Sequence, residues 1–224
     1  MRMFQQFRTA LRRRAALKAR FDIKNPTEAV EESCVVSYGH PNPAVALAAW
    51  SRVAMAIRLW RHHARQGAVL DFGAGSGEIS HFLGTGQDYH FIEADPSLAG
   101  ALGSFVSHAR HEVLEDLPAG AFACVMALDS LEHNDDVAAI VDHLALALAP
   151  GGVLIVSGPT ENALYRLARA IARFRGEHFH KTTIYHIESV LAERFTRLEM
   201  HGVPFGLPLF RVSAWRLPAL ASGP

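Results

Sequence analysis

Three alternating glycines constrain this chain more than any other feature. Residues 68–77 read AVLDFGAGSG, so an apolar run leads directly into Gly73, Gly75 and Gly77. Glycine permits a tight turn and lets the backbone approach a ligand closely. Amide groups at the N-terminus of a following helix favour a negatively charged ligand group. The pattern therefore predicts a ligand-binding loop after the first strand of an α/β sheet.

Strand-like and helix-like segments alternate along the rest of the chain. The expected strands are residues 68–72, 89–94, 112–115, 122–128, 153–157, 197–201 and 209–215. The expected helices are residues 43–65, 78–83, 97–108, 136–149, 162–175 and 186–194. Such alternation is typical of parallel βαβ units, and the last two strands could pair as a hairpin. We therefore expect an α/β fold with a doubly wound, mostly parallel sheet of seven strands.

Composition excludes several classes of protein. The chain has 224 residues, half of them hydrophobic, which suits one domain with an appendage and excludes global disorder. Lys and Arg total 22, as do Asp and Glu, and this neutral balance argues against a nucleic-acid partner. Cys34 and Cys124 form neither a disulfide scaffold nor a zinc pattern, so we expect a cytoplasmic protein.

The N-terminal part of the chain is predicted to be helical. The first 20 residues carry seven basic residues and no acid, together with an apolar stripe at helical spacing. The stripe consists of Met3, Phe4, Phe7 and Leu11. Such a helix can lie on an anionic membrane surface, or it can dock on the protein through its two Phe side chains. In the helix at 43–65, the expected buried face is Leu47, Trp50, Ile57 and Trp60.

An acid follows the second expected strand. Glu93 lies 20 positions after Gly73, a spacing that suits an acid on ribose hydroxyls, and Asp95 is a competing candidate. The glycine loop could also bind a dinucleotide, which leaves an NAD(P)-dependent oxidoreductase as an alternative. Glu78 stands where the dinucleotide fingerprint has Gly or Ala. Asp71 suits the ammonium of an amino-acid-like ligand better than a diphosphate.

Five short segments follow one another within residues 68–158. They are VLDFGAGSG at 69–77, FIE at 91–93, FACV at 122–125, LEH at 131–133 and LAPGGVL at 148–154. Their joint order and spacing resemble class I S-adenosylmethionine (SAM) dependent methyltransferases. The LEH segment, and more loosely GEHFHK at 176–181, resemble the branch that contains ubiquinone-biosynthesis O-methyltransferases.

The resemblance implies which positions bind SAM. They are Asp71, Gly73, Gly75, Gly77, Glu93, Leu114, Leu128 and Asp129. The glycines would pass under the methionine and ribose, Asp71 would hold the amino group, and Glu93 would bind the ribose hydroxyls. Leu128 and Asp129 would flank the methionine moiety, and Leu114 would lie beside the adenine. Many relatives carry an acid at the position of Val113, so adenine recognition could instead fall to backbone groups or to nearby acids.

Methyl transfer to a neutral hydroxyl is an in-line displacement that also needs a base, and His is suited to that role near neutral pH. His133 follows the fourth expected strand, and His178 lies after the fifth, so we expect His133 first and His178 second as the base. Both could instead be structural, His133 near a helix start and His178 on a loop surface. Glu132, His133 and Asp136 form no pattern strong enough to predict a metal site.

These features together predict a SAM-dependent methyltransferase that acts on a hydroxyl of a small or lipid-linked molecule. A SAM-binding partner subunit without turnover is an alternative. Basic amphipathic character in residues 1–20 and 163–175 predicts peripheral contact with an anionic membrane, whereas an ordinary helix with a solvated arginine face is the other interpretation of the second segment.

Three parts of the chain are expected. Residues 1–66 would form a helical extension or lid. Residues 67–216 would form the Rossmann-like methyltransferase domain, and residues 217–224 would form a C-terminal tail.

Overall fold

The structure, a computed structural model, describes residues 2–218 apart from 65, 85, 173–179 and 205. It contains a seven-stranded sheet with the order β3-β2-β1-β4-β5-β7-β6. The strands are β1 (Ala68–Phe72), β2 (Tyr89–Ile92), β3 (Arg110–His111), β4 (Phe122–Leu128), β5 (Leu148–Pro159), β6 (Thr196–Val203) and β7 (Phe210–Arg216). Strand β7 runs antiparallel to β5 and β6, and the other neighbours are parallel. The predicted mostly parallel sheet and its C-terminal hairpin are confirmed.

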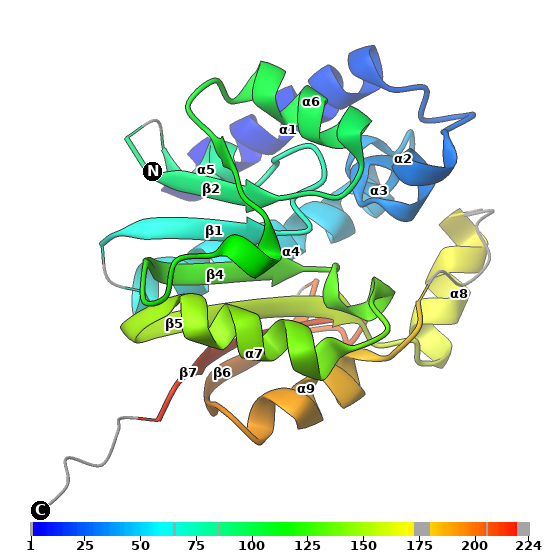
Figure 1. The fold of residues 1–224 in the computed structure, drawn as a ribbon. Coiled ribbons are helices and arrows are strands. Elements are labelled where there is room, and N and C mark those ends of the chain that lie inside the picture. The colour runs from blue at the N-terminus through cyan, green and yellow to red at the C-terminus, as the bar shows by residue number, and fades with distance from the viewer. Residues whose placement is uncertain (1, 65, 85, 173–179, 205, 219–224) are drawn as a thin grey trace, which may run out of the picture.

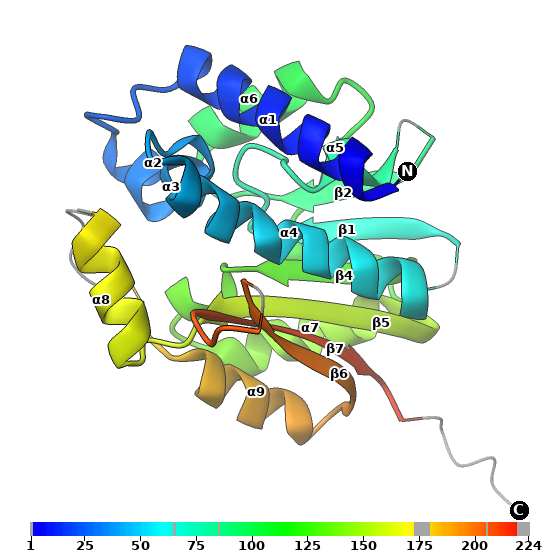
Figure 2. The same ribbon diagram turned by 180° about the vertical axis from the view of Figure 1, so that it is seen from behind.

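Helices cover both faces of this sheet. They are α1 (Arg2–Arg20), α2 (Glu28–Glu32), α3 (Val35–Gly39), α4 (Pro43–His63), α5 (Ser80–Leu83), α6 (Pro96–Phe105), α7 (Val137–Ala147), α8 (Ala163–Ala172) and α9 (Ile184–Ala192). Helices α7 and α9 lie over the face seen in Figure 1, and α4 crosses the opposite face seen in Figure 2. Helix α4 contacts β4 to β7, so this part of the expected helical extension packs directly against the sheet.

Successive residues of the central strands face opposite helix layers. In β4, Cys124 and Met126 pack in the core that includes α4, whereas Val125 and Ala127 pack in the core that includes α7 and α9. Side chains alternate across a strand, and here both faces are covered. This double burial explains why the strand is apolar throughout and shows no polar alternation.

The topology opens a crevice at the carboxyl ends of β1 and β4. These strands are neighbours in the sheet, although β2 and β3 separate them in the sequence. The chain leaves β1 toward one edge of the sheet and returns at β4 toward the other, so the two following loops diverge. Doubly wound sheets bind their ligands at such a switch point. The glycine loop is one of these two loops.

Helix α1 forms as predicted, but Phe7 does not pack this helix against the rest of the protein. Phe7 and Leu11 are 53% and 49% exposed, so this part of the apolar stripe faces away from the protein. Arg13 and Leu17 are buried instead, one turn apart, and α1 contacts α3, α4 and α5. The side chains of residues 2–4 lie outside the described part of the chain, so the outcome for Met3 and Phe4 stays open.

Two other predictions need correction. Leu47 is 44% exposed, because the buried face of α4 runs through Ala46, Ala49 and Val53, about 100° around the helix from it. Trp50 and Ile57 are buried as expected. The strand expected at 112–115 is wrong: β3 is only Arg110–His111, and Leu114–Asp116 forms a 3-10 turn.

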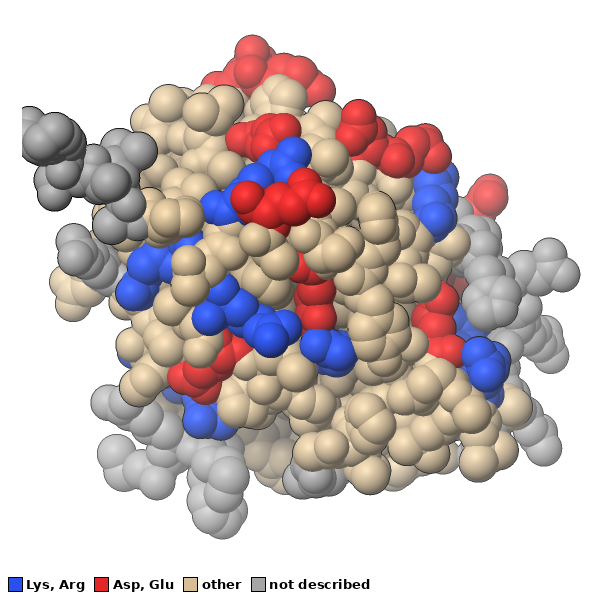
Figure 3. Space-filling model, turned by 90° about the horizontal axis from the view of Figure 1, so that it is seen from below, with Lys and Arg blue, Asp and Glu red and all other residues tan. Residues whose placement is uncertain are grey.

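No helix in the described part of the chain is long and apolar enough to cross a membrane. On the face seen in Figure 3, Lys and Arg side chains lie beside Asp and Glu side chains, with uncharged residues between them. Charges of both signs are therefore mixed on this face, in keeping with the chain's net charge of zero.

Arg13 joins α1 to the end of the glycine loop. Its Nε and Nη2 donate to the two carboxylate oxygens of Glu78 at 3.0 and 2.7 Å, and both side chains are buried. Arg13→Ala leaves this carboxylate buried without its partner, so we expect the free energy of unfolding to fall by about 3–5 kcal/mol in urea titrations.

Arg12→Ala is the matched control, since Arg12 is exposed. We expect it to change the free energy of unfolding by no more than about 0.5 kcal/mol. The double variant Arg13→Leu/Glu78→Leu should be much closer to wild type than Arg13→Ala, because it removes both charges. Equal losses in the control and in Arg13→Ala would contradict this assignment.

Candidate active site

The glycine loop adopts a conformation that other residues rarely take. Gly73, Gly75 and Gly77 have φ angles of 68°, 55° and 77°. A Cβ on Gly73 would lie 2.4 Å from the Cβ of Ser130, whereas a Cβ on Gly75 would meet nothing within 4 Å. Gly73 therefore permits close contact with the loop after β4, and Gly75 borders open space that a ligand can fill.

In the sequence, Glu93 and Asp95 are both candidates to bind the ribose hydroxyls. The structure gives these two acids different contacts. The Glu93 carboxylate accepts hydrogen bonds from the Gly75 amide at 2.7 Å and the Asp95 amide at 2.9 Å. It therefore links the glycine loop to the end of β2. The Asp95 carboxylate caps α6 by accepting from the amides of Ser97 and Leu98. Both acids line the crevice over the glycine loop, but of the two only Glu93 accepts a hydrogen bond from the loop itself, so its role on the ribose stays a prediction.

Asp71 is buried beneath the glycine loop. Its Oδ2 accepts a hydrogen bond of 2.6 Å from the Tyr89 hydroxyl. Burial raises the pKa of Asp71 to about 7, against the lowering effect of the Tyr89 hydrogen bond, and the charge of Glu93 raises it further. A cationic group that approached Asp71 would stabilise its ionised form.

A cavity of about 600 Å³ lies over the glycine loop. Six of the predicted SAM-binding residues line it, namely Asp71, Gly73, Gly75, Glu93, Leu128 and Asp129. Gly77 is not among the lining residues; a Cβ there would lie 2.6 Å from Leu102, so this glycine permits packing against α6. Leu114 also lies outside the cavity and packs against the core beneath α7, so its role beside the adenine stays a prediction.

A second cavity, of about 800 Å³, lies beside the first. Four residues line both cavities: Ser33, Cys34, Asp129 and His133. Helices α3, α4 and α8 contribute walls of the larger cavity, through residues such as Val36, Ala48 and Tyr165. The two cavities therefore meet where the N-terminal segment faces the loop after β4.

A buried ion pair holds this junction together. Arg52 of α4 pairs with Asp129, which follows β4 with a φ of 50°. Asp129 also accepts a hydrogen bond of 2.8 Å from the Ser157 hydroxyl, and the Cys34 thiol donates to it at 3.4 Å. Sequence reasoning missed both Arg52 and Cys34 as site residues. A signal for Arg52 was available, since a single charge in an apolar stretch of helix usually needs a buried partner.

Three titratable side chains lie beside His133, namely Glu132, His180 and Glu161. Glu132 is buried, and neither of its carboxylate oxygens has a hydrogen bond to another described residue. The rings of His133 and His180 meet edge to face at 5.2 Å, and the His180 Nδ1 lies 2.6 Å from a Glu161 carboxylate oxygen. Burial raises the pKa of Glu132 to about 7, although the Arg52 charge lowers it. This cluster can bind a proton or a cation.

The predictions for the base have different outcomes. The structure places His133 at the junction of the two cavities, and its role as the base stays a prediction. His178 lies outside the described residues, and His180 is the imidazole found beside His133. No metal site was predicted here, yet ligand atoms of Glu132, His133 and His180 all lie within 4.8 Å of one another and could hold a divalent ion.

A family model described as a methyltransferase domain matches residues 49–195, well over half of the chain. The chain belongs to this family. The predicted resemblance to SAM-dependent methyltransferases is thereby confirmed, and SAM is the cofactor of that family.

One curated relative is a ubiquinone biosynthesis O-methyltransferase of Xylella fastidiosa (strain 9a5c). It is 32% identical over an alignment of 152 positions that covers 60% of this chain. The match spans 62% of that protein's length, which is less than two thirds of it.

Solved structures of methyltransferases share the fold. Magnesium protoporphyrin IX methyltransferase from Synechocystis PCC 6803, with bound S-adenosylhomocysteine (SAH), is 16% identical, with a TM-score of 0.61 over 80% of this chain and 90% of that one. The N-methyltransferase NodS from Bradyrhizobium japonicum WM9, in complex with SAH, is 19% identical, with the same TM-score and coverage. At such identities the likeness shows the fold alone, and it confirms the predicted Rossmann-like class.

Glu132 should give the protein's stability a measurable pH dependence. Its folded pKa of about 7 exceeds the ordinary value of 4.5, so between these values the folded state binds more protons than the unfolded state. Stability therefore falls as pH rises through this window. In chelator-treated protein, the free energy of unfolding of Glu132→Gln minus that of wild type should be about 3 kcal/mol higher at pH 8 than at pH 5, so the variant becomes relatively more stable as the pH rises.

The control variant is Glu115→Gln, because Glu115 is exposed. Its free energy of unfolding should stay parallel to that of wild type across the same pH range. A difference between Glu132→Gln and wild type that did not change with pH would show that Glu132 is not the group described above.

Proposed function

We propose that this protein transfers the methyl group of SAM to a hydroxyl of a small or lipid-linked molecule. The observation that carries the proposal is the meeting of two cavities at Cys34, Asp129 and His133. A methyl donor in the cavity over the glycine loop and an acceptor in the larger cavity would face each other at this junction. The curated O-methyltransferase relative supports a hydroxyl as the acceptor.

The residues around the first cavity fit SAM. Open space above Gly75 leaves room for the cofactor, and the Asp71 carboxylate suits its ammonium group. Glu93 has carboxylate oxygens at the same wall and suits the ribose hydroxyls. When bound, SAM supplies an electrophilic methyl group on a sulfonium.

His133 is the proposed general base. The His133 imidazole would take the proton of the acceptor hydroxyl while the oxygen takes the methyl group from SAM, which would leave as SAH. A neutral hydroxyl is a weak nucleophile, so proton removal adds to the effect of in-line placement. Glu132 and His180 lie beside this imidazole and can stabilise its protonated form.

The lining of the larger cavity suits an acceptor with a polar end and an apolar end. Lys24, Arg169 and His180 line it together with apolar side chains such as Val36 and Phe210. A hydroxylated ring with an apolar tail would satisfy both kinds of wall. A volume of about 800 Å³ is within the range of pockets that bind small organic ligands.

Incubation with methyl-labelled SAM and a cell extract tests the function. We expect label in a product, which partitioning between organic and aqueous phases would assign to the lipid or small-molecule class. His133→Ala should lower kcat by about 10²–10⁴-fold, because it removes the base, while the Kd for SAH stays unchanged. His143→Ala, an exposed position on α7, is the control and should match wild type.

Other results would support other functions. Binding of SAH without any labelled product would favour a partner subunit without turnover. Thermal stabilisation by NAD(P)H and not by SAH would favour an oxidoreductase. Activity that is lost with a chelator and restored by a divalent ion would assign the Glu132, His133 and His180 cluster to metal binding in place of proton transfer.

We further propose peripheral contact with an anionic membrane, through two exposed patches. On α1, Phe7 and Leu11 are exposed at adjacent turns next to exposed Arg8 and Arg12. On α8, Leu164 and Leu167 are exposed, while Tyr165, Ala168 and Arg169 of the same helix line the larger cavity. An apolar helix face flanked by arginines suits anionic lipid, and the second patch would place the cavity near a lipid-linked acceptor.

Flotation with anionic liposomes tests this contact. Wild type should co-float, and Phe7→Ser/Leu11→Ser and Leu164→Ser/Leu167→Ser should each lower the partition coefficient about 100-fold. Each pair removes about 3 kcal/mol of apolar transfer free energy. Leu146→Ser on α7, also at an exposed leucine, should float like wild type. Equal flotation of all three variants, or none by wild type, would exclude these patches as the contact.

A further inference from the structure

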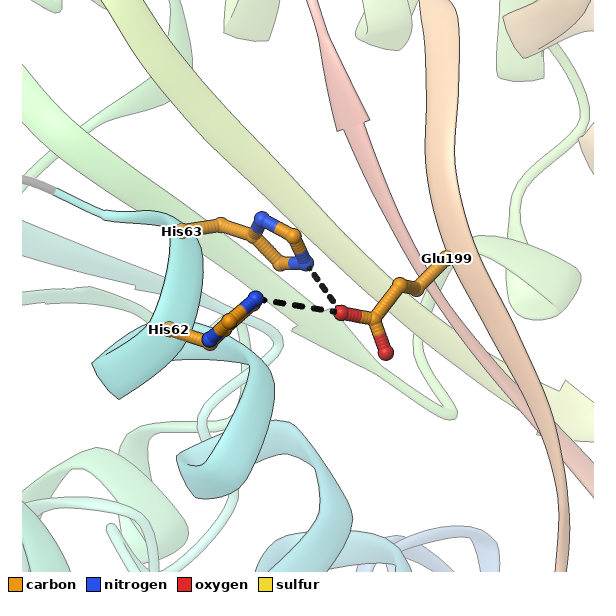
Figure 4. Close-up of side chains that lie close together, drawn as sticks. All are labelled: His62, His63 and Glu199. Atoms are coloured by element: carbon orange, nitrogen blue, oxygen red, sulfur yellow. Dashed lines mark hydrogen bonds and ion pairs between the residues drawn. The ribbon is translucent and has the colours of Figure 1, made fainter.

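A second cluster of histidines lies far from the cavities, between α4 and the edge of the sheet. His62 and His63 end α4, and Glu199 lies on the edge strand β6 (Figure 4). Arg52, at the junction of the cavities, is 11 residues before His63 on the same helix, which is about 16 Å along the axis. The cluster therefore belongs to a different part of the molecule from the candidate active site.

Both imidazoles point at the same carboxylate oxygen. The Nε2 of His63 lies 2.7 Å from Glu199 Oε1, and the Nε2 of His62 lies 3.7 Å from it (Figure 4). The three ligand atoms all lie within 4.8 Å of one another. His63 is mostly buried, with 15% of its side chain exposed, whereas His62 has 70% exposed.

The other oxygen of Glu199 is held separately. The Nε2 of His201 lies 2.8 Å from Glu199 Oε2, and the Arg58 guanidinium lies 3.9 Å from the same oxygen. This contact fixes the carboxylate plane and leaves Oε1 directed at His62 and His63. Carboxylates that bind metal ions are commonly held by hydrogen bonds in this way.

The donor set matches the preference of zinc-like ions. Two imidazole nitrogens and one carboxylate oxygen are ligands that Zn²⁺ takes, at about 2.0–2.1 Å each. Tetrahedral geometry at such lengths separates ligand atoms by about 3.3 Å, which lies between the 2.7 and 3.7 Å found around Oε1. The exposed side of His62 leaves a fourth position open to water.

We propose that His62, His63 and Glu199 form a structural site for a divalent transition-metal ion of the zinc class, with His201 as the residue that positions the carboxylate. The ion would join the C-terminal end of α4 to the edge strand β6. Arg216 already reaches this corner, since its Nη2 donates to the His63 carbonyl at 2.9 Å. The effect of the ion would fall on stability, because the active site lies at the other end of α4.

A metal-free latch of histidines on one carboxylate would need only two of the three imidazoles around Glu199. His63 and His201 alone would satisfy the two oxygens of Glu199. His62 is largely exposed and could point into water, yet its Nε2 also faces Oε1. Its ring also meets the His63 ring edge to face at 4.5 Å, so both imidazoles are held together at Oε1, where one ion could bind all three groups.

Titration of untagged, chelator-treated full-length protein with ZnCl₂ tests the site. We expect Zn²⁺ to raise the Tm, and Mg²⁺ at equal concentration to leave it unchanged, because imidazole is a poor ligand for Mg²⁺. In calorimetry, His62→Ala should weaken Zn²⁺ binding about 100-fold, and His201→Ala should weaken it about 10-fold to 100-fold. Both substitutions fall on residues at least partly exposed, so the chain should still fold.

Two control variants separate this site from other histidines. His108→Ala removes an exposed histidine outside both clusters and should bind Zn²⁺ like wild type. His133→Ala disables the cluster at the cavities and should keep the Zn²⁺-dependent rise in Tm. No Zn²⁺ stabilisation of wild type, or a Zn²⁺ affinity that His62→Ala and His63→Ala leave unchanged, would overturn the proposal.

Discussion

The ion pair between Arg52 and Asp129 is the interaction on which the rest of the site depends. Arg52 lies over the Phe210 ring at 4.2 Å and donates to the Ser37 hydroxyl at 3.3 Å, so one guanidinium contacts α3, β7 and the loop after β4. The Ser157 hydroxyl holds Asp129 from β5. Two buried charges are stable only when their pairing and hydrogen bonds are nearly complete. The pair therefore fixes the N-terminal helices against the carboxyl ends of the strands, and with them the boundary between the two cavities.

The neutral charge of the chain reflects local compensation of this kind. Arg13 of α1 pairs with Glu78 of the glycine loop, as Arg52 of α4 pairs with Asp129. In both pairs a base from the first 66 residues meets an acid at the cofactor crevice. The bases concentrated near the N-terminus are thus partly directed inward, where they complete the crevice. The rest, such as Arg8 and Arg12, are exposed beside apolar side chains.

The sequence predicted the strands and the glycine loop well, because both depend on short-range constraints. An apolar run buried on both faces and a φ that only glycine tolerates leave direct marks in the residues. The junction of the cavities could not be predicted in this way, since Cys34 and Asp129 are 95 positions apart and meet only through packing. The spacing of apolar residues also does not show what covers that face of a helix. Leu47 was therefore wrongly expected to be buried, and docking of the first helix through Phe7 was only one of two alternatives.

The burial of Glu132 follows from how its loop is held. Its carbonyl accepts hydrogen bonds from the amides of Lys181 and Thr182, which fixes the loop after β4 to the segment before α9 and turns the carboxyl group inward. A buried carboxyl group without a hydrogen-bond partner lowers stability, and proteins retain such groups chiefly at functional sites. With a pKa of about 7, Glu132 changes charge near neutral pH, directly beside the His133 imidazole. A ligand that brings a hydrogen-bond donor or a cation to Glu132 would recover this lost free energy on binding. Under the proposed mechanism, the same side chain would couple acceptor binding to proton transfer at His133.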